Sequence, residues 1–222
     1  MSSTIRSTPE PGIAEAISRL AGATAGGTRG LPQLDGEQLD KLRVYLEVLL
    51  LWRSRIALIS TADPLLLVEH HILDSLHVAE HIPERARVAD IGSGAGLPGI
   101  PLAVARPQAS FALIESRRKK ANFLREARRL ADLPNVQVVE ARAEQALSPA
   151  SFDVIISRAL GSVDEFLDHG ARLLVAGGSA VAMRGPDGDG DAVNDIRFDA
   201  PKVLAYELTL DRRRTLLVYR RR

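Results

Sequence analysis

Apolar residues recur along this chain with two different patterns, and the change falls near residue 86. Over 34–52 and again over 65–81 they recur at helical spacing, and Asp63 with Pro64 supplies a capping residue and a helix start ahead of the second segment. From residue 86 onward short apolar runs alternate with amphipathic segments. This alternation predicts a mostly parallel sheet with helices on both faces.

The pattern also predicts the order of the elements. Strands are expected at 87–91, 111–114, 136–139, 152–156 and 179–183, with a closing hairpin at 203–210 and 215–219, which makes seven in all. Helices are expected at 100–105, 117–131 and 163–174, with a turn at Gly177-Gly178 and a flexible loop over 185–195. We expect a disordered tail over 1–30, with weak helical spacing at 13–20, then a helical extension over 31–84 and an α/β domain over 85–222.

One stretch carries the main chemical signal. The apolar run 87–91 contains Asp90 and leads into Gly92, Gly94, Gly96 and Gly99, after which an apolar helical pattern begins. Glycines in such a strand–loop–helix unit permit positive φ and let a ligand approach the backbone. The helix start behind them offers free N–H groups and a partial positive charge. The loop is therefore expected to cradle a nucleotide-like ligand.

The acidic residue before the loop distinguishes between two ligands. A dinucleotide loop has the spacing G-x-G-x-x-G/A, whereas the spacing here is G-x-G-x-G. Asp90, two residues before the first glycine, would repel a pyrophosphate and suits a cationic amino-acid end. The pattern favours S-adenosylmethionine in a class I, Rossmann-like methyltransferase fold, with Gly92, Gly94 and Gly96 around the sulfonium. NAD, or a glycine turn without a ligand, is the alternative interpretation.

Further candidates follow the next strands. Glu115 ends the second strand, where a carboxylate can accept both ribose hydroxyls. Ala143 and Glu144 follow the third strand, where the adenine ring would lie. Arg158 follows the fourth strand, where the acceptor would face the methyl group; it suits an anionic or electron-rich acceptor such as a nucleic acid, or it pairs with an acid at the surface.

Composition removes several classes of function. The chain has no cysteine, so disulfides and Cys nucleophiles are excluded, and the Asn/Asp-Pro-Pro-aromatic motif of exocyclic amine methylation is absent. No apolar run reaches the roughly 18 residues of a membrane span, and no signal peptide is evident, so we expect a cytoplasmic protein. The 29 basic and 28 acidic residues nearly balance, but the basic ones crowd 117–129 and 212–222. Neither the histidines at 70–81 nor the aspartates at 187–191 predict a metal site.

At this point the sequence resembles the RsmG (GidB) family, which methylates N7 of one guanine in bacterial small-subunit (16S) ribosomal RNA. The resemblance covers about residues 35–220 and is carried by Leu58, His71-Ile72-Leu73-Asp74-Ser75, the loop from Asp90 through Gly-Leu-Pro-Gly-Ile-Pro101, and Ile156-Ser157-Arg158-Ala159. It implies contacts with S-adenosylmethionine at Gly92, Leu97, Ala143, Glu144 and Arg158. It also implies an RNA face built from the N-terminal helices, the Arg184 region and Arg214. Arg158, Arg184 and Arg214 are expected on the catalytic side. The protein is expected to act as a monomer on ribosomal RNA or the small subunit.

The sequence departs from this family at several positions. Trp52-Arg53 and Ala57-Leu58-Ile59 stand where the family has Trp-Asn and Asn-Leu-Thr, and His70 stands in place of an arginine. Arg184 replaces a lysine, which keeps the charge but changes the donor geometry. These changes affect the guanine side of the site and not the cofactor side. A methyltransferase acting on a small molecule and a non-catalytic protein that binds S-adenosylmethionine therefore remain open as alternatives.

Overall fold

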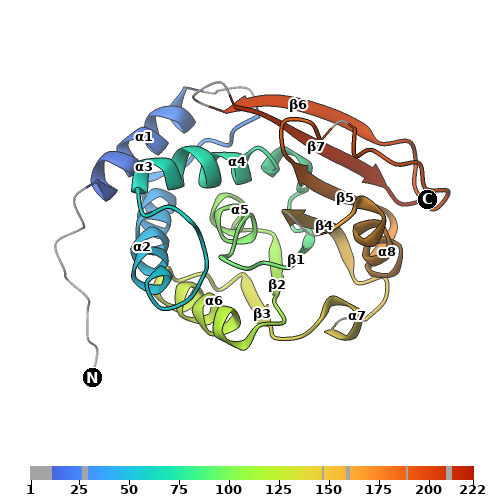
Figure 1. Ribbon diagram of the computed structural model, residues 1–222, viewed down its shortest axis with the longest axis horizontal. Helices are drawn as coiled ribbons and strands as arrows, with labels where there is room; N and C mark the ends of the chain where they lie inside the picture. Colours follow the sequence, from blue (N-terminus) through green and yellow to red (C-terminus); the bar gives the residue numbers. More distant parts are fainter. Residues whose placement is uncertain (1–11, 27–29, 147, 159–160, 189, 209–211) are drawn as a thin grey trace.

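A single twisted sheet organises the computed structural model, which describes residues 12–26, 30–146, 148–158, 161–188, 190–208 and 212–222. Within these residues seven strands pair in the order β3-β2-β1-β4-β5-β7-β6 (Figure 1). Their bounds are β1 Arg87–Ile91, β2 Ser110–Ile114, β3 Val136–Val139, β4 Phe152–Arg158, β5 Leu174–Arg184, β6 Lys202–Leu208 and β7 Arg212–Arg220. The first five strands are parallel, and β7 runs antiparallel to both β5 and β6.

Helices cover both faces of the sheet (Figure 1). The helical elements of the described residues are α1 Ile13–Ala25, α2 Gly36–Arg53, α3 Pro64–Leu67, the π-helical η1 Val68–Ile72, α4 Leu73–Leu76, the 3₁₀ turn η2 Ala79–His81, α5 Gly99–Ala105, α6 Arg118–Leu130, α7 Ala143–Ala146 and α8 Val163–Leu173. Side chains of α5 and α6 share one core with α1, α2 and α4, whereas α8 packs on the opposite face with Phe166 and Leu167.

The order of the strands creates an opening at one point. From β1 the chain continues to β2 on one side of β1, and β4 later fills the other side, with Asp90 paired to Leu113 and to Ile156. The connections that leave the carboxyl ends of β1 and β4 therefore run in opposite directions, to β2 and to β5, and ligands bind at such switch points in open α/β sheets. The expected class I methyltransferase-like arrangement of a mostly parallel seven-stranded sheet is thus present.

The N-terminal tail expected over 1–30 is wrong for residues 13–25. These residues form α1, whose Ile13, Ala16 and Leu20 are fully buried. The spacing of these apolar residues is helical but short, and only contact with α2 and the 64–72 segment makes the helix part of the core. Residues 1–11 and 27–29 lie outside the described residues, and the division of the chain at residue 84 stays a prediction.

The turn expected at Gly177-Gly178 is also wrong, because both glycines lie within β5. The pairing of β4 with β5 shifts between Phe152↔Leu174 and Val154↔Ser179, so the extra residues form a bulge in the strand. Gly177 has φ 75° there, and Gly178 O accepts a hydrogen bond from Arg221 N. A glycine pair in the sequence is compatible with a bulge as well as with a turn, and the pairing with a neighbouring strand decides which of the two forms.

In the part of the chain that the structure describes, none of the helices combines the length and the apolar character that crossing a membrane requires.

The packing of α1 is testable by truncating one side chain. Leu20→Ala should lower the free energy of unfolding by about 2–5 kcal/mol, because Leu20 is fully buried and its removal leaves a cavity. The control Leu51→Ala alters a leucine that is 51% exposed and should change stability by no more than about 0.5 kcal/mol. Urea denaturation of the full chain measures both, and equal stability of the two variants would show that α1 does not belong to the core.

Candidate active site

The glycine loop takes its shape from positions that glycine occupies more easily than any other residue. Gly92, Gly94 and Gly96 all have positive φ, of 74°, 55° and 84°. A Cβ at residue 96 would lie 2.5 Å from Ile100 Cδ1, so a side chain there would collide with the first turn of α5. The backbone N–H groups of Gly92 and Ser93 donate to Ile114 O, which ties the loop to the end of β2. The loop thus presents bare backbone at the carboxyl end of β1.

Asp90 lies beneath this loop rather than on its surface. Its side chain is fully buried, and Oδ2 accepts a hydrogen bond of 3.1 Å from Gly99 N at the start of α5. A Cβ at residue 99 would lie 2.6 Å from that oxygen, which explains why glycine is needed there. Oδ1 is buried without a hydrogen-bond partner among the described residues. Burial raises the pKa of Asp90 to about 7, against the opposing effects of the Ser93 hydroxyl and the Gly99 amide.

Glu115 spans the loop and the segment after β2. Its Oε2 accepts from Gly94 N at 3.0 Å and its Oε1 accepts from Arg117 N at 2.7 Å. A carboxylate has about four acceptor positions, so two amides hold it in place and leave acceptors for a ligand. The side chain lines a cavity of about 220 Å³ at the carboxyl ends of β1, β2 and β3.

The same cavity brings together predicted cofactor residues from three strands. Gly92, Glu115, Ala143 and Glu144 line it, with His169 of α8 at its margin. Ala143 is buried at the start of α7, and Glu144 Oε1 lies 3.6 Å from His169 Nε2. The predicted contacts at Asp90, Gly94, Gly96, Leu97 and Arg158 do not line this cavity, and Leu97 packs in the core.

These residues fit S-adenosylmethionine. A carboxylate already fixed by two amides suits the ribose, and the small residues Gly92 and Ala143 leave room for a ligand among the larger side chains that line the cavity. Of the predicted residues, those that line the cavity and would hold the cofactor are Gly92, Glu115, Ala143 and Glu144, with Gly94 and Gly96 in the adjoining loop. Asp90 supports the loop from below, and its unpartnered Oδ1 is the feature that suits a cationic group.

Arg158 and Arg214, predicted from distant parts of the chain, share one buried carboxylate. Asp74 of α4 is 3% exposed; its Oδ2 lies 3.8 Å from Arg158 Nε and its Oδ1 lies 3.8 Å from Arg214 Nε. Tyr206 of β6 donates its hydroxyl to Oδ1 at 2.6 Å. The Arg158 guanidinium also contacts His71 Nδ1. Burial, and then Arg158, lowers the pKa of His71 to about 4, so this imidazole is neutral at pH 7.

Arg158 also lies next to the glycine loop. In the sheet register Ile156 pairs with Asp90, so Arg158 is two residues past that pair, level with Gly92. Ser157 Oγ donates to Ile91 O at 3.0 Å and joins the ends of the two strands. The cluster of Asp74, Arg158, Arg214 and Tyr206, which we call the arginine cluster, therefore lies beside the cofactor loop.

Arg184, the third predicted arginine, is not part of this cluster. Its Nε lies 3.7 Å from Asp191 Oδ2, and its Nη1 donates to Gly161 O at 3.3 Å. Side chains alternate along a strand, and Arg184 shares its face of β5 with Ala182, which packs in the core beneath α8. Arg184 is therefore separate from the other two arginines, and its expected place on the catalytic side stays a prediction.

Three residues of the site were missed by reasoning from the sequence. Asp74 and His71 belong to the segment that carries the family resemblance, but no role was assigned to either. Tyr206 is paired with Arg214 in the β6–β7 hairpin. The one available signal was an acidic residue, Asp74, within an otherwise apolar helical stretch, since an acid at a buried position needs partners.

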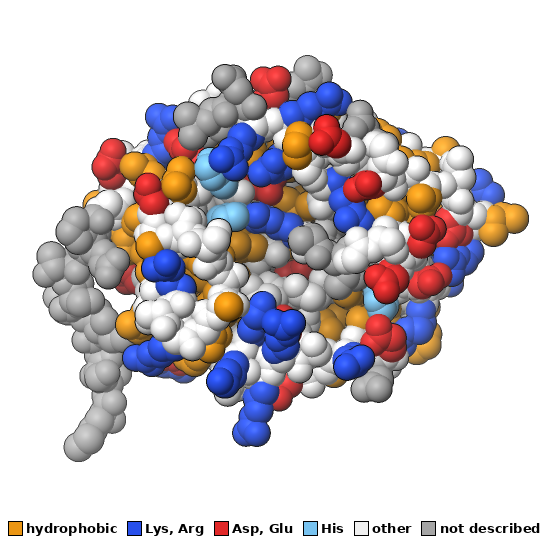
Figure 2. Space-filling view, viewed as in Figure 1, with side chains coloured by type: hydrophobic (Ala, Val, Ile, Leu, Met, Phe, Trp, Pro, Cys, Tyr) orange, Lys and Arg blue, Asp and Glu red, His pale blue; other side chains and the backbone are white. Residues whose placement is uncertain are grey.

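Charge is distributed unevenly around the site. In Figure 2 Lys and Arg side chains gather over α6 and over the region of α4, whereas acidic side chains gather on the side of α8. Arg118 and Lys119, in the first turn of α6, are exposed and follow Arg117, whose backbone N–H donates to Glu115. The basic start of α6 therefore adjoins this cavity, and its positive charge favours an anionic ligand.

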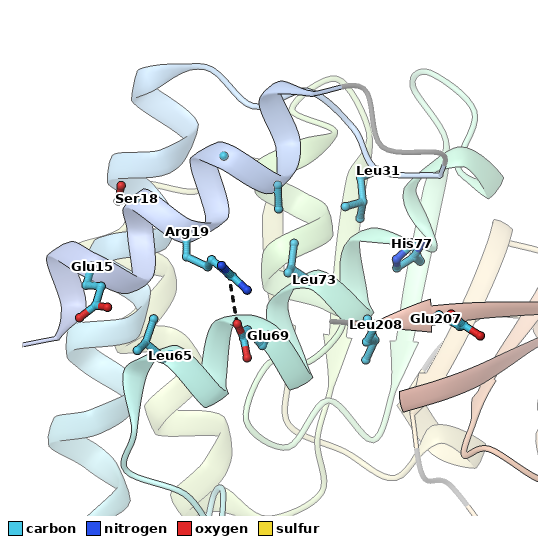
Figure 3. A pocket seen from close by; sticks show the side chains of 12 residues that line it. Glu15, Ser18, Arg19, Leu31, Leu65, Glu69, Leu73, His77, Glu207 and Leu208 are labelled. Carbon is cyan, nitrogen blue, oxygen red and sulfur yellow. Dashed lines mark ion pairs between the residues drawn. The ribbon is translucent and has the colours of Figure 1, made fainter. Parts of the chain in front are cut away.

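A second cavity, of about 850 Å³, lies between α1, η1 and β6. Figure 3 shows Arg19 and Glu69 facing each other within it, with Nε and Oε1 3.2 Å apart. No residue of the glycine loop lines this cavity. Among the described residues there is also no group of three or more His, Asp or Glu side chains that could hold a metal ion.

The parallel sheet with its switch point, the glycine loop over a buried acid and the carboxylate after β2 define a class I S-adenosylmethionine-dependent methyltransferase. The sequence model of the family described as rRNA small subunit methyltransferase G (GidB) matches residues 38–197. The chain belongs to this family, which confirms the resemblance inferred from the motifs.

Curated relatives agree with this assignment. The chain is 43% identical over 159 residues to "Ribosomal RNA small subunit methyltransferase G" of Xanthomonas axonopodis pv. citri, covering 71% of this chain and 74% of that protein. It is 40% identical over 166 residues to the protein of the same description from Chromobacterium violaceum, covering 73% and 79% of the two chains.

Solved structures confirm the fold class. The tRNA (m1A58) methyltransferase TrmI from Aquifex aeolicus superposes with a TM-score of 0.57 at 16% identity, covering 80% of this chain and 76% of that chain. TYW2 from M. jannaschii, solved in complex with AdoMet, gives 0.53 at 17% identity over 75% and 78%. At these identities the likeness concerns the fold alone.

The role of Glu115 is testable by an amide substitution. Glu115→Gln should weaken binding of S-adenosylhomocysteine by at least about tenfold, because an amide NH₂ would then face a backbone N–H and the charge would be lost. Glu140→Gln is a matched control, since Glu140 also follows a strand but pairs with the exposed Arg125. Isothermal titration calorimetry measures both affinities. Equal affinities would remove Glu115 from the cofactor site.

The buried carboxyl of Asp90 predicts a pH dependence. Its pKa is raised from 3.8 to about 7 in the folded chain, so the native state binds a proton that the unfolded state releases between these values. This contribution to stability is complete below pH 4 and is lost as the pH rises through 7. Asp90→Asn removes it, so the variant should gain stability relative to the wild type with rising pH, by up to about 1.4 kcal/mol per pH unit.

Urea denaturation without cofactor between pH 4.5 and 8 measures this difference. Asp40→Asn, which alters an exposed carboxyl, should follow the wild-type curve. A constant difference between Asp90→Asn and the wild type across this range would contradict the raised pKa.

Proposed function

We propose that this protein transfers a methyl group to N7 of a guanine in small-subunit (16S) ribosomal RNA. The observation that carries the proposal is the pair of arginines, Arg158 and Arg214, held by one buried carboxylate beside the cofactor loop. Membership of the rRNA small subunit methyltransferase G family supports an RNA substrate. An RNA substrate would also place the protein in the cytoplasm.

Methylation of guanine N7 requires mainly that the protein position the methyl donor and the acceptor. S-adenosylmethionine, when bound, supplies an electrophilic methyl group on a sulfonium. Guanine N7 carries a free lone pair and loses no proton on methylation, so the protein need not provide a general base. Catalysis then depends on alignment and on charge around the acceptor.

The residues of the site divide these tasks. Glu115 orients the ribose, and the glycine loop fixes the position of the methyl donor. Arg158 and Arg214 hold the acceptor through phosphate or base oxygens, while Asp74 lies next to Nε of each. Both N7 and O6 of guanine are acceptors, and an arginine is well suited to donate to such an edge.

The charges around the site also suit RNA. The exposed Arg118 and Lys119 lie at the start of α6, next to the cofactor cavity. Phosphate contacts by such residues release counterions, so binding should weaken steeply with salt. A small-molecule substrate would show little salt dependence, and this difference separates the proposed function from that alternative.

The proposal is tested by methyl transfer in vitro. The purified protein, with tritiated S-adenosylmethionine, should label small ribosomal subunits or their RNA in a salt-dependent manner, and mass spectrometry of the isolated RNA should find N7-methylguanine. Arg158→Lys and Arg214→Lys should lower the rate by roughly 10–100-fold, because a bidentate donor is lost. The control Arg87→Lys changes an arginine that pairs with Asp153 at the amino end of β1.

Three results would contradict the proposal. Labelling of a different atom of the RNA would refute the N7 assignment. Turnover of small molecules without RNA would favour the small-molecule enzyme. Binding of S-adenosylhomocysteine without transfer to any ribosomal particle would favour a non-catalytic protein, which is the alternative raised by Arg53 and Ala57.

A further inference from the structure

We propose that Asp74 is the positioning residue of the acceptor site: its single carboxylate, supplied by the helical extension, holds Arg158 and Arg214 together on the acceptor side. This inference rests on the proposed function, because it assigns those two arginines to the acceptor. It gives the N-terminal helices a part in the reaction itself, beyond any contact that they make with RNA.

The two arginines would not converge without a bridging acid. Arg158 is on β4 and Arg214 on β7, with β5 between them, so the two strands are about 10 Å apart at the usual strand spacing. Each lies on the same face of the sheet as the core beneath the extension, alongside Ile156 and Leu216. Two cations on one face repel each other, and a carboxylate between them offsets that repulsion.

Asp74 meets this requirement with both of its oxygens. Oδ1 lies 3.8 Å from Arg214 Nε and accepts the Tyr206 hydroxyl, while Oδ2 lies 3.8 Å from Arg158 Nε. The carboxylate is nearest to Nε in each case, while Arg158 Nη2 contacts His71 and Arg214 Nη1 donates to Arg213 O. Arg158 Nη1 is in fact buried without a hydrogen-bond partner among the described residues.

His71, one turn before Asp74, holds the same arginine from a second direction. It contacts the Arg158 guanidinium through Nδ1, and it lies in the π-helical segment η1, which changes the phase of the helix just before α4. Wider turns of this kind place side chains that a regular α-helix would direct elsewhere, and they are frequent at functional sites. Since His71 is neutral, it adds a hydrogen-bond acceptor without adding a third positive charge.

Stability alone explains this arrangement poorly. Burial raises the pKa of Asp74 even though both arginines and Tyr206 oppose the shift, so the carboxylate is held at a free-energy cost. Ion pairs of 3.8 Å recover only part of the desolvation penalty of a buried charge. A role in holding the two arginines accounts for an acid at this position.

The experiment compares Asp74→Asn with Glu69→Gln in the full-length protein. Glu69 is a matched control, because it is a nearly buried acid in the adjacent turn that pairs with Arg19 at 3.2 Å and faces the other cavity (Figure 3). Asp74→Asn should lower kcat for methylation of small subunits by roughly 10–100-fold. It should leave the affinity for S-adenosylhomocysteine within about twofold of the wild type, since it leaves the cofactor contacts in place. Glu69→Gln should leave both unchanged, and thermal unfolding records the stability of each variant.

A second readout does not depend on activity. In wild-type protein the Nε–H groups of Arg158 and Arg214 should give protected ¹H–¹⁵N signals, assigned with Arg158→Lys and Arg214→Lys. Both signals should be lost in Asp74→Asn and retained in Glu69→Gln. If the wild type methylates no ribosomal particle, the proposed function fails, and these signals still decide whether Asp74 positions the two arginines.

Two results would overturn the inference: equal kcat values for Asp74→Asn and Glu69→Gln, or Nε–H signals that persist in Asp74→Asn. If Asp74→Asn does not fold, Tyr206→Phe decides, because it removes only the hydroxyl that donates to Asp74 Oδ1. A fall in kcat of about 2–10-fold with unchanged cofactor affinity would support the role, and an unchanged kcat would refute it.

Discussion

The buried carboxylate of Asp90 is the constraint on which the cofactor site depends. It lies one residue before the end of β1, on the face that α5 covers, and it accepts a hydrogen bond from Gly99 N at the far end of the loop. A buried acid must find donors, and here the donor is the first amide of a helix. This hydrogen bond fixes the distance between strand and helix, and the intervening residues are left to form a tight loop with three glycines at positive φ. The position of the loop in turn sets where Glu115 can bind it.

The helical extension is continuous with the rest of the molecule. Its buried residues share one core with α5, α6 and one face of the sheet, and the Tyr45 hydroxyl donates to Ala95 O of the glycine loop at 2.7 Å. The extension also supplies Asp74 and His71 to the arginines of β4 and β7. It therefore contacts the glycine loop on one side and Arg158 and Arg214 on the other, which connects these two regions through packed elements.

Much of the fold was predictable because its signals are local. The alternation of short apolar runs with amphipathic segments gave the sheet class, and capping at Asp63-Pro64 gave a helix start that the structure retains. The predictions failed where residues outside a segment decide the conformation of that segment. Helix α1 is stable through contact with α2, and Gly177 and Gly178 lie in a strand because β4 and β7 pair with it. No local pattern distinguishes these outcomes, since the same residues suit a tail or a turn.

By itself the sequence determined the family and the glycine loop with its positive φ angles, and it indicated the carboxylate of Glu115, because these depend on contiguous residues and their spacing. Only the tertiary structure decided how the three predicted arginines are grouped. Strand order and the alternation of side chains direct Arg158 and Arg214 toward Asp74 and direct Arg184 to the opposite face, toward Asp191. That grouping joins residues up to 140 positions apart, since Asp74 and Arg214 meet only when β7 inserts between β5 and β6. Contacts between residues so far apart in the sequence follow from the topology of the sheet, and no local sequence pattern predicts them.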